Sequence, residues 1–207
     1  MSNNQAIQSL KSQRTYVMMK PDGVQRGLTG EVIKRIETLG LKVVALKMVS
    51  ASEETIRAHY PMQDQSWVDR LGEKGLGTFE SLGMDAKAIL GTDDKSEIGA
   101  SVAESLVAYM QSGPVVCMVV EGIGAVDAVR KLVGHTLPFK AEPGTIRGDF
   151  SVDSPAVANV EGRAIHNVVH ASELPEEAET EINLWFEDSE ITSYRRAGED
   201  IMYGKTY

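Results

Sequence analysis

The sequence predicts an α/β (α+β) fold, a ferredoxin-like split βαβ sandwich whose four-stranded antiparallel sheet is covered by helices. The first observation is the order of its patterns, because short apolar or β-branched runs alternate with segments of helical spacing and give four strands. The second is the turn Pro21-Asp22-Gly23 after the first strand, which matches neither the glycine fingerprint of dinucleotide-binding folds nor a P-loop. A doubly wound parallel sheet is therefore the weaker alternative.

The first part of the chain predicts strands that alternate with helices. A short apolar strand covers 15–20. Apolar residues then recur at helical spacing over 28–39, and Gly40 suits the end of that helix. The valine-rich stretch 41–49 predicts the second strand, and Ser52 with two following glutamates opens another helix.

The middle of the chain is the hardest part to assign. Residues 61–98 are rich in glycine, and we expect only short helices there, at 67–71 and 80–90. Helical spacing returns over 98–110. The continuous apolar run 114–120 predicts a central strand that is covered on both faces.

The last third of the chain predicts a helix over 125–133 and a loop rich in Pro and Gly over 137–149. The β-branched stretch 164–169 predicts the fourth strand, which ends on His170. Pro175 begins the last major helix, since proline favours the first helical position. The remaining residues are polar and are expected to wrap over the surface.

Composition and charge restrict the class of protein. The chain has 207 residues, 42% of them hydrophobic, and a net charge of -9, which disfavours general nucleic-acid binding. The single Cys117 excludes an intramolecular disulfide, and its apolar surroundings predict a buried, inert thiol. Residues 1–14 form a polar leader without an apolar signal region, and no stretch reaches membrane-spanning length. We therefore expect a cytoplasmic protein that contacts neither membrane nor nucleic acid.

His170 is the first candidate for chemistry. A strand that ends on a histidine can hold the ring at one fixed angle, and a nucleophilic imidazole needs such a direction and one free nitrogen. A packed structural histidine is the alternative. Two arginines, Arg130 and Arg147, offer planar forks that suit phosphate oxygens, although each could equally be a surface charge.

Several separate blocks, in the right order, resemble the nucleoside diphosphate kinase family. The matching blocks are Lys20 to Leu28, His59-Tyr60, Ser112 to Val115, Pro143 to Phe150, Asn167 to Ser172 and Glu176 to Phe186. Ala171 stands where glycine is commoner in the family. The resemblance extends over about 15–60 and about 105–203.

The resemblance implies an enzyme that transfers the γ-phosphate of a nucleoside triphosphate to a nucleoside diphosphate. It implies a ping-pong mechanism through a phosphohistidine at His170. Glu181 matches the glutamate that holds this ring in the correct tautomer, and Ser172 matches the serine that bonds to that glutamate. Lys20 completes the implied catalytic set.

The resemblance also implies the nucleotide contacts and the metal. The implied contacts are Lys20, Tyr60, Leu106, Arg130, Thr136, Arg147 and Asn167. Mg²⁺ would be bound by the phosphates rather than directly by the protein, with Glu173 near it. The implied partners are nucleoside di- and triphosphates, and the implied assembly is a homo-oligomer, either a tetramer or a hexamer.

The other histidines are expected to play no part in the chemistry. His59 and His135 are interpreted as structural or surface residues. His166 and His170 would lie on one face of the predicted strand, too far apart to form a helical metal pair.

The chain departs from the family in two respects. An insertion is expected at about 61–103, as a lid over the base or a subunit contact. Val102 falls near the position of the aromatic residue that stacks on the base, so that aromatic is missing or displaced. Trp67 and Phe79 could replace it, although both suit the core of the insertion better.

Three functional classes therefore compete. The leading class is the phosphotransferase, and the second is a catalytically weak nucleotide-binding or regulatory relative. The third, an RNA-binding ferredoxin-like module, is disfavoured by the acidic charge and by the lack of paired aromatics on the strands.

Overall fold

A four-stranded antiparallel sheet forms the centre of the computed structural model, which describes residues 7 and 10–203. The strands are β1 (Gln13–Met19), β2 (Lys42–Val49), β3 (Val115–Gly122) and β4 (Val169–Ala171). Their order in the sheet is β2-β3-β1-β4, and every neighbouring pair is antiparallel. The predicted ferredoxin-like sheet is confirmed. β1 begins two residues before the predicted strand, and most of the predicted leader at 1–14 lies outside the described residues.

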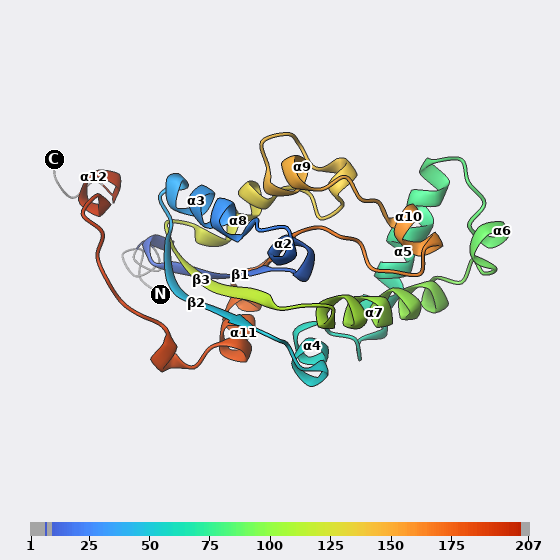
Figure 1. Cartoon of the computed structure of the whole chain (residues 1–207), viewed down its shortest axis with the longest axis horizontal. Coiled ribbons are helices and arrows are strands. Elements are labelled where there is room, and N and C mark those ends of the chain that lie inside the picture. Colours follow the sequence, from blue (N-terminus) through green and yellow to red (C-terminus); the bar gives the residue numbers. More distant parts are fainter. Residues whose placement is uncertain (1–6, 8–9, 204–207) are drawn as a thin grey trace.

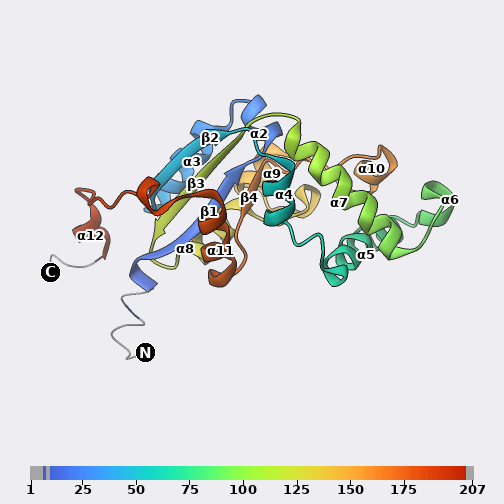
Figure 2. The same cartoon turned by 90° about the horizontal axis from the view of Figure 1, so that it is seen from below.

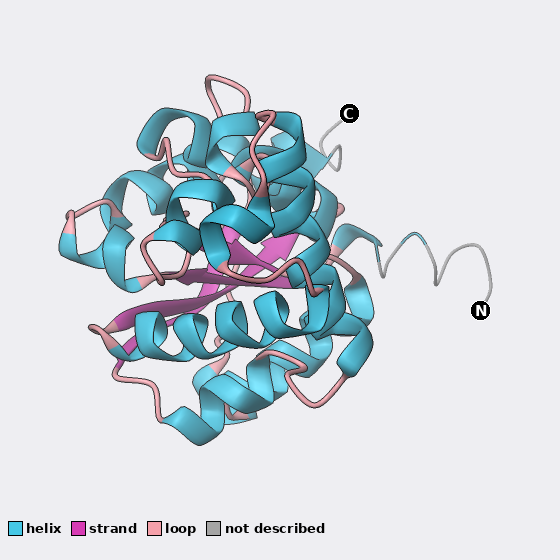
Figure 3. Cartoon of the chain, turned by 90° about the vertical axis from the view of Figure 1, so that its right-hand side faces the viewer, coloured by secondary structure: helices cyan, strands magenta, loops and turns pink. Residues whose placement is uncertain are grey.

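Helices cover both faces of the sheet. The main helices are α2 (Pro21–Gln25), α3 (Thr29–Leu39), α4 (Glu53–His59), α5 (Gln65–Ser81), α6 (Ala86–Leu90), α7 (Lys95–Gln111), α8 (Ala125–Val133), α9 (Ile146–Phe150), α10 (Pro155–Val160), α11 (Pro175–Trp185) and α12 (Glu199–Tyr203). Short 3-10 turns follow at η1 (Pro138–Lys140) and η2 (Asp188–Glu190). Figure 1 shows α3, α8 and α9 on one side of the sheet and α4 and α11 on the other, and Figure 3 shows the strands between the two layers.

The alternation of side chains along β1 builds two cores, one on each face. Tyr16 and Met18 enter the core under α4, α7 and α11, whereas Val17 and Met19 enter the core under α3 and α8. β3 is buried along its apolar run on both faces, as its continuous hydrophobicity predicts. Cys117 is buried there, and its sulfur accepts a hydrogen bond from the Tyr16 hydroxyl at 3.1 Å.

Residues 61–98 fold differently from the prediction of short helices. α5 is one helix of 17 residues that continues through Gly72, Gly75 and Gly77, and α6 follows as a single short turn of helix. The glycines serve packing, because a Cβ at Gly72 would lie 1.9 Å from the backbone oxygen of Lys95. Figure 2 shows α5 beside α7, the close crossing that these glycines permit.

We expect Gly99→Ala to destabilise this crossing, because its Cβ would lie 2.0 Å from the backbone oxygen of Val68. Forcing the two backbones apart should lower the free energy of unfolding by about 1–3 kcal/mol, even though alanine favours a helix. Gly77→Ala is the matched control, since a Cβ there meets nothing within 4 Å. It should stabilise the chain by about 0.5–1 kcal/mol in the same urea titration. A Gly99 variant as stable as the Gly77 variant would contradict the packing role.

A third, smaller core joins α5 and α6 to α10. Phe79, Ala86 and Ala156 are buried against one another, with Leu76 and Leu90 beside them. Phe79 is fully buried here, so it belongs to the core of the insertion and is not free to stack on a base. Two segments far apart in the sequence are thereby held together at the end of the molecule on the right of Figure 1.

The fourth strand is shorter than predicted. β4 contains only Val169–Ala171, with His170 at its centre instead of just beyond its end. Val168 interrupts the predicted strand at φ 67°, the one non-glycine residue of the described chain with positive φ. The Asp22 carboxylate accepts the Val168 N–H at 3.2 Å, and the Lys20 N–H donates to the Val168 carbonyl at 2.9 Å. Backbone contacts from a distant segment therefore override the β preference of the valines.

The predicted strand face that joined His166 to His170 is consequently wrong. His166 lies outside the sheet, and its ring stacks on Tyr109 with centroids 4.9 Å apart. The polar C-terminal segment runs beside β2, where the Thr192 N–H donates to the Val44 carbonyl at 2.8 Å. Among the described residues, no helix is long and apolar enough to cross a membrane.

Candidate active site

His170 lies beneath a carboxylate that fixes its ring. The Nε2 atom of His170 is 2.7 Å from Oε1 of Glu181, which reaches it from α11. The other carboxylate oxygen accepts a hydrogen bond from the Ser172 hydroxyl at 2.5 Å, and that hydroxyl accepts the N–H of Tyr16 at 3.3 Å. Glu181 is only 4% exposed, so its carboxylate is buried beside the ring instead of facing solvent.

The surroundings of His170 favour a neutral ring in one tautomer. Burial, followed by the positive charges of Lys20, Arg147 and Arg130, holds its pKa well below the ordinary value. Burial raises the pKa of Glu181, against the opposing effects of His59 and the Ser172 hydrogen bond. With the proton of the ring donated from Nε2 to Glu181, the lone pair remains on Nδ1. The arrangement gives an imidazole a free nitrogen and a fixed direction.

His59 is the residue of this site that sequence reasoning missed. Its ring centroid lies 4.6 Å from that of His170 in an edge-to-face arrangement, and its Nδ1 atom lies 3.4 Å from Glu181 Oε1. The Trp185 indole N–H donates to the same Nδ1 at 3.3 Å. Burial lowers the pKa of His59 to about 3, so its ring is neutral. The prediction of a structural role holds, and the alternative of a surface residue is wrong.

Arg147 is a buried cation that pairs with no carboxylate of the residues that the structure describes. Its guanidinium donates to the backbone carbonyls of Gly134 and Val169, both at 2.7 Å, and more weakly to that of Asn167 at 3.4 Å. Burial, followed by the charge of Arg130, lowers the pKa of Arg147 to about 10. Because carbonyl dipoles orient this charge without neutralising it, the site attracts an anion.

Lys20 is held by Asn167 at the edge of the same site. The Lys20 ammonium donates to Oδ1 of Asn167 at 2.8 Å, and the amide nitrogen of Asn167 donates to the Thr136 carbonyl at 3.0 Å. The Asn167 amide thus connects Lys20 with Thr136, and all three residues are predicted nucleotide contacts. Lys20 and Asn167 are both buried, so their positions are fixed before a ligand arrives.

The remaining predicted contacts lie around this group. Arg130 donates to Glu173 at 3.1 Å, and the Glu173 side chain is 67% exposed. The Tyr60 ring meets that of His170 edge-to-face at 6.4 Å between centroids. Leu106 lies on α7 and packs against the core that contains Tyr16 and Met18.

Lys20, Arg130 and Arg147 thus lie around one oriented imidazole, an arrangement whose charge suits a polyphosphate. A sequence profile described as "Nucleoside diphosphate kinase" matches residues 13–69 and 95–191. The chain belongs to the nucleoside diphosphate kinase family. It is therefore an enzyme that transfers phosphate between nucleotides.

Individual nucleoside diphosphate kinases support this assignment. The enzyme of Pyrobaculum aerophilum is 52% identical over 179 residues, which cover 86% of this chain and 97% of that enzyme. Its crystal structure has a TM-score of 0.82 and covers 88% of this chain and 100% of its own. A structure from Borrelia burgdorferi, a transition-state mimic with bound vanadate and ADP, is 37% identical with a TM-score of 0.73 and covers 94% and 99% of the two chains.

The match to the nucleoside diphosphate kinase profile leaves out residues 70–94. This gap lies within the predicted insertion at 61–103 and contains most of α5, all of α6 and the loop before α7. Val102 lies beyond the gap, on α7, and is half-buried. Trp67 is half-buried as well, and its ring packs against Tyr60 at 6.2 Å between centroids.

We expect nucleotide binding by this nucleoside diphosphate kinase to weaken as the pH rises. Burial, followed by the charge of Arg147, lowers the pKa of Lys20 from 10.5 to about 7, with Asp22 opposing. The free enzyme therefore loses the Lys20 charge above about pH 7, and a bound phosphate must restore it with uptake of a proton. The Kd of ADP should rise above that pH by at most about ten-fold per pH unit.

Calorimetric titration in buffers of different ionisation enthalpy measures both the affinity and the proton uptake. Lys20→Met is the matched variant, and it should bind ADP more weakly without the pH-dependent uptake of a proton.

The lowered pKa of Lys20 also affects folding. It makes the free energy of unfolding rise with pH between about 7 and 10.5, because the unfolded chain keeps a proton that the folded chain has released. A wild-type Kd that is flat above pH 7 would contradict the lowered pKa.

Proposed function

We propose that His170 carries the phosphoryl group between two nucleotides that bind in turn. The observation that carries the proposal is the hydrogen bond of Nε2 to Glu181, which leaves Nδ1 as the free nucleophile in a neutral ring. A nucleophile whose partner fixes its tautomer and direction satisfies the geometric requirement for covalent catalysis.

The reaction has two matched halves. Nδ1 of His170 attacks the γ-phosphorus of a nucleoside triphosphate, the bond between this phosphorus and the β–γ bridging oxygen breaks, and the nucleoside diphosphate leaves. The terminal β-phosphate oxygen of a second diphosphate then attacks the same phosphorus and releases the ring. The proton on Nε2 remains hydrogen-bonded to Glu181 in both halves, and Ser172 holds the carboxylate in place.

The cations supply most of the catalysis that phosphoryl transfer needs. The reaction gains chiefly from positioning and from stabilising charge on the phosphoryl oxygens. We assign Arg130, Arg147 and Thr136 to the phosphates, with Tyr60 beside them. Lys20 and Asn167 are assigned to the sugar hydroxyl and the phosphates, and Leu106 to the apolar surroundings of the base.

We also propose Mg²⁺ as the metal that accompanies the nucleotide. The described residues bring one group of three possible metal ligands together, His59, His170 and Glu181, and its two nitrogens suit Mg²⁺ poorly. Phosphate oxygens and water would therefore supply most ligands, and Glu173 is the carboxylate we place near the ion. When bound, the ion would neutralise part of the charge on the phosphates.

Incubation with γ-labelled ATP in the absence of an acceptor tests the proposal directly. The protein should take up a phosphate that is acid-labile and alkali-stable, as expected for phosphohistidine, and added ADP should remove it. A catalytically weak regulatory relative would bind ATP without this exchange. No label above background in a folded sample would overturn the proposal.

We expect little discrimination among nucleotide bases. All polar contacts assigned above go to the sugar and the phosphates, so only contacts outside this set can distinguish one base from another. Steady-state kcat/KM values for purine and pyrimidine diphosphates should therefore differ by well under roughly 10³-fold. Larger ratios would require several hydrogen bonds to the base edge and would contradict the assignment.

Assembly and location remain predictions. We propose a homo-oligomer, either a tetramer or a hexamer, which light scattering of the purified chain distinguishes by mass. Leu46 and Met48 on β2 are more than half exposed, and such apolar side chains suit contact with a second copy. The cytoplasm is the proposed compartment.

A further inference from the structure

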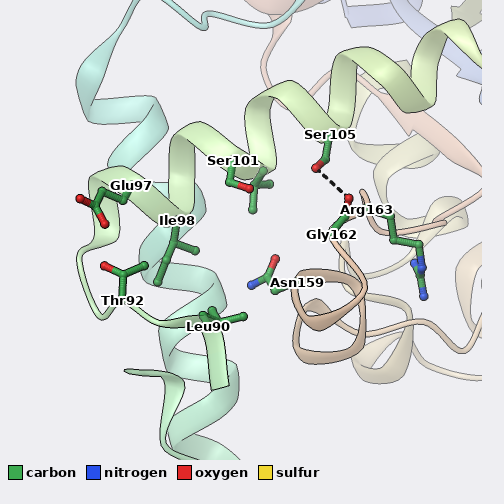
Figure 4. A pocket seen from close by; sticks show the side chains of 10 residues that line it. Leu90, Thr92, Glu97, Ile98, Ser101, Ser105, Asn159, Gly162 and Arg163 are labelled. Atoms are coloured by element: carbon green, nitrogen blue, oxygen red, sulfur yellow. Dashed lines mark hydrogen bonds between the residues drawn. The ribbon is translucent and has the colours of Figure 1, made fainter. Parts of the chain in front are cut away.

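A cavity of about 220 Å³ lies beside α7, between the insertion and α10. Figure 4 shows Leu90 and Thr92 of the insertion on one side, Ser101 and Ser105 of α7 above, and Asn159 pointing inward from α10. The Ser105 hydroxyl donates to the Gly162 carbonyl at 3.4 Å, which joins α7 to the segment after α10. The cavity is therefore built in part by residues 70–94, which the family profile does not contain.

A second cavity of about 100 Å³ is lined both by Thr136 and by residues that border the first cavity. It extends from Thr136, which we assign to the phosphates, to the same three residues that border the first cavity, Val102, Asn159 and Arg163. A nucleotide whose phosphates reach Thr136 would thus direct its base toward Val102 and Asn159. This is also the place where the stacking aromatic of the family is missing.

Asn159 presents an unused hydrogen-bond donor at this junction. Its side-chain nitrogen is buried and has no hydrogen-bond partner, one of three such side-chain atoms in the described part of the chain. The nitrogen fits only because residue 75 is glycine, since a Cβ there would lie 2.7 Å from it. A buried amide without a partner is unfavourable, so an acceptor on a ligand is its expected complement.

Arg163, the other polar residue that borders both cavities, is already paired. The Arg163 guanidinium donates to both carboxylate oxygens of Asp153, at 2.5 and 3.0 Å, and to Glu161 at 2.6 Å. Its donors are occupied by these carboxylates, whereas the Asn159 nitrogen has none. Among the three residues that border both cavities, Asn159 is therefore the polar one whose donor has no partner.

We propose that Asn159 is a specificity-determining residue, whose amide donates a hydrogen bond to a carbonyl oxygen on the edge of the base. Val102 and Ile165 provide the apolar contacts of the same cavity. An N–H donor pairs with O6 of guanine or O4 of uracil, whereas adenine and cytosine carry at the same ring position an amino group that donates instead. The inference rests on the proposed function and refines it, because one hydrogen bond gives a modest preference within the limit predicted above.

The test compares kcat/KM for GDP with ADP, and for UDP with CDP, with one phosphate donor throughout. Wild type should favour the keto member of each pair by about three- to ten-fold, the value of one hydrogen bond. Asn159→Ala should bring both ratios close to one, and Asn159→Asp, an acceptor, should reverse them. Lys87→Ala, on the exposed side of the insertion, is the control and should keep the wild-type ratios.

Gly75→Ala provides an independent variant that leaves Asn159 in place. The added Cβ displaces the amide nitrogen, while alanine favours the helix, so the ratios should fall towards one without a lower Tm. A merely structural role for Asn159 would instead lower Tm and leave the ratios unchanged. Ratios identical in wild type and Asn159→Ala would overturn the inference.

The labelling experiment separates the two levels of failure. If the same preparations form phosphohistidine from ATP but the base ratios do not respond to Asn159, the specificity inference alone is wrong. If no phosphoenzyme forms, the proposed function itself fails.

Discussion

Replacement of His170 by alanine is expected to abolish phosphate transfer while the chain stays folded. The side chain carries the free Nδ1 nucleophile, and the residues around it position charge without offering another one. Loss of a nucleophile costs enzymes on the order of 10⁶-fold in turnover. The coupled assay with ATP and a second diphosphate measures this loss, and labelled ATP should leave no phosphate on the protein.

The control for this variant is His135→Ala. His135 is exposed, and its Nδ1 atom accepts the Leu137 N–H at 3.0 Å, so it caps a turn and does not join the His170 cluster. Its loss should leave the rate of transfer within a few-fold of wild type. Transfer that survives in the His170 variant with wild-type secondary structure would show that phosphate moves by another route.

The second large effect is expected at Glu181. The carboxylate oxygen lies 2.7 Å from Nε2, accepts its proton in a hydrogen bond, and faces the positive charge that develops on the ring when Nδ1 bonds to phosphorus. Glu181→Gln keeps an acceptor but removes the charge, so phosphorylation should slow by about 10- to 100-fold, the value of a charge-assisted hydrogen bond. Glu181→Ala also frees the tautomer and should cost about 10² to 10³-fold or more.

Single-turnover phosphorylation by ATP measures these rates without contributions from product release. Nitrogen NMR of His170 should show the Nε2–H tautomer in wild type and a mixture of tautomers in Glu181→Ala. Glu179→Gln serves as the control, because this residue is exposed on the same helix. Equal rates for the two glutamine variants would mean that Glu181 contributes nothing beyond its position.

The antiparallel sheet could be predicted because each strand has a local signal. The apolar run of β3 and the helical spacing of α8 before Gly134 reflect which of their side chains are buried, so both elements can be identified from the sequence. The length of β4 could not be predicted. Val168 takes a left-handed backbone because of Asp22 and Lys20, which lie about 146 residues earlier in the chain. The conformational preferences of neighbouring residues carry no information about such a distant contact.

The continuous helix α5 could not be predicted from the sequence for a similar reason. Glycine lowers helix propensity, so its recurrence predicts breaks. In the folded chain Gly72 and Gly99 are the points where α5 and α7 approach, and that contact stabilises the helix more than the propensity weakens it. The benefit exists only once both helices are present.

The active-site residues were predicted from the order of several motifs, but their contacts were not. The sequence places Glu181 among other glutamates, and only the fold buries it against His170 and Ser172. His59 could have been noticed, because it follows the buried Ile56 by three residues and therefore lies on the same face of α4. Its approach to His170 depends on the packing of α4 against α11, which no local pattern encodes.

The unusual backbone of Val168 has a consequence for the whole molecule. A β-branched residue in this conformation lowers the free energy of unfolding by about 1–3 kcal/mol relative to a relaxed turn. That loss falls two residues before the reactive imidazole, between the Asp22 and Lys20 contacts that enforce it. The chain is thus less stable than it could be at this point, and in return the ring that we propose as the nucleophile is held at one angle.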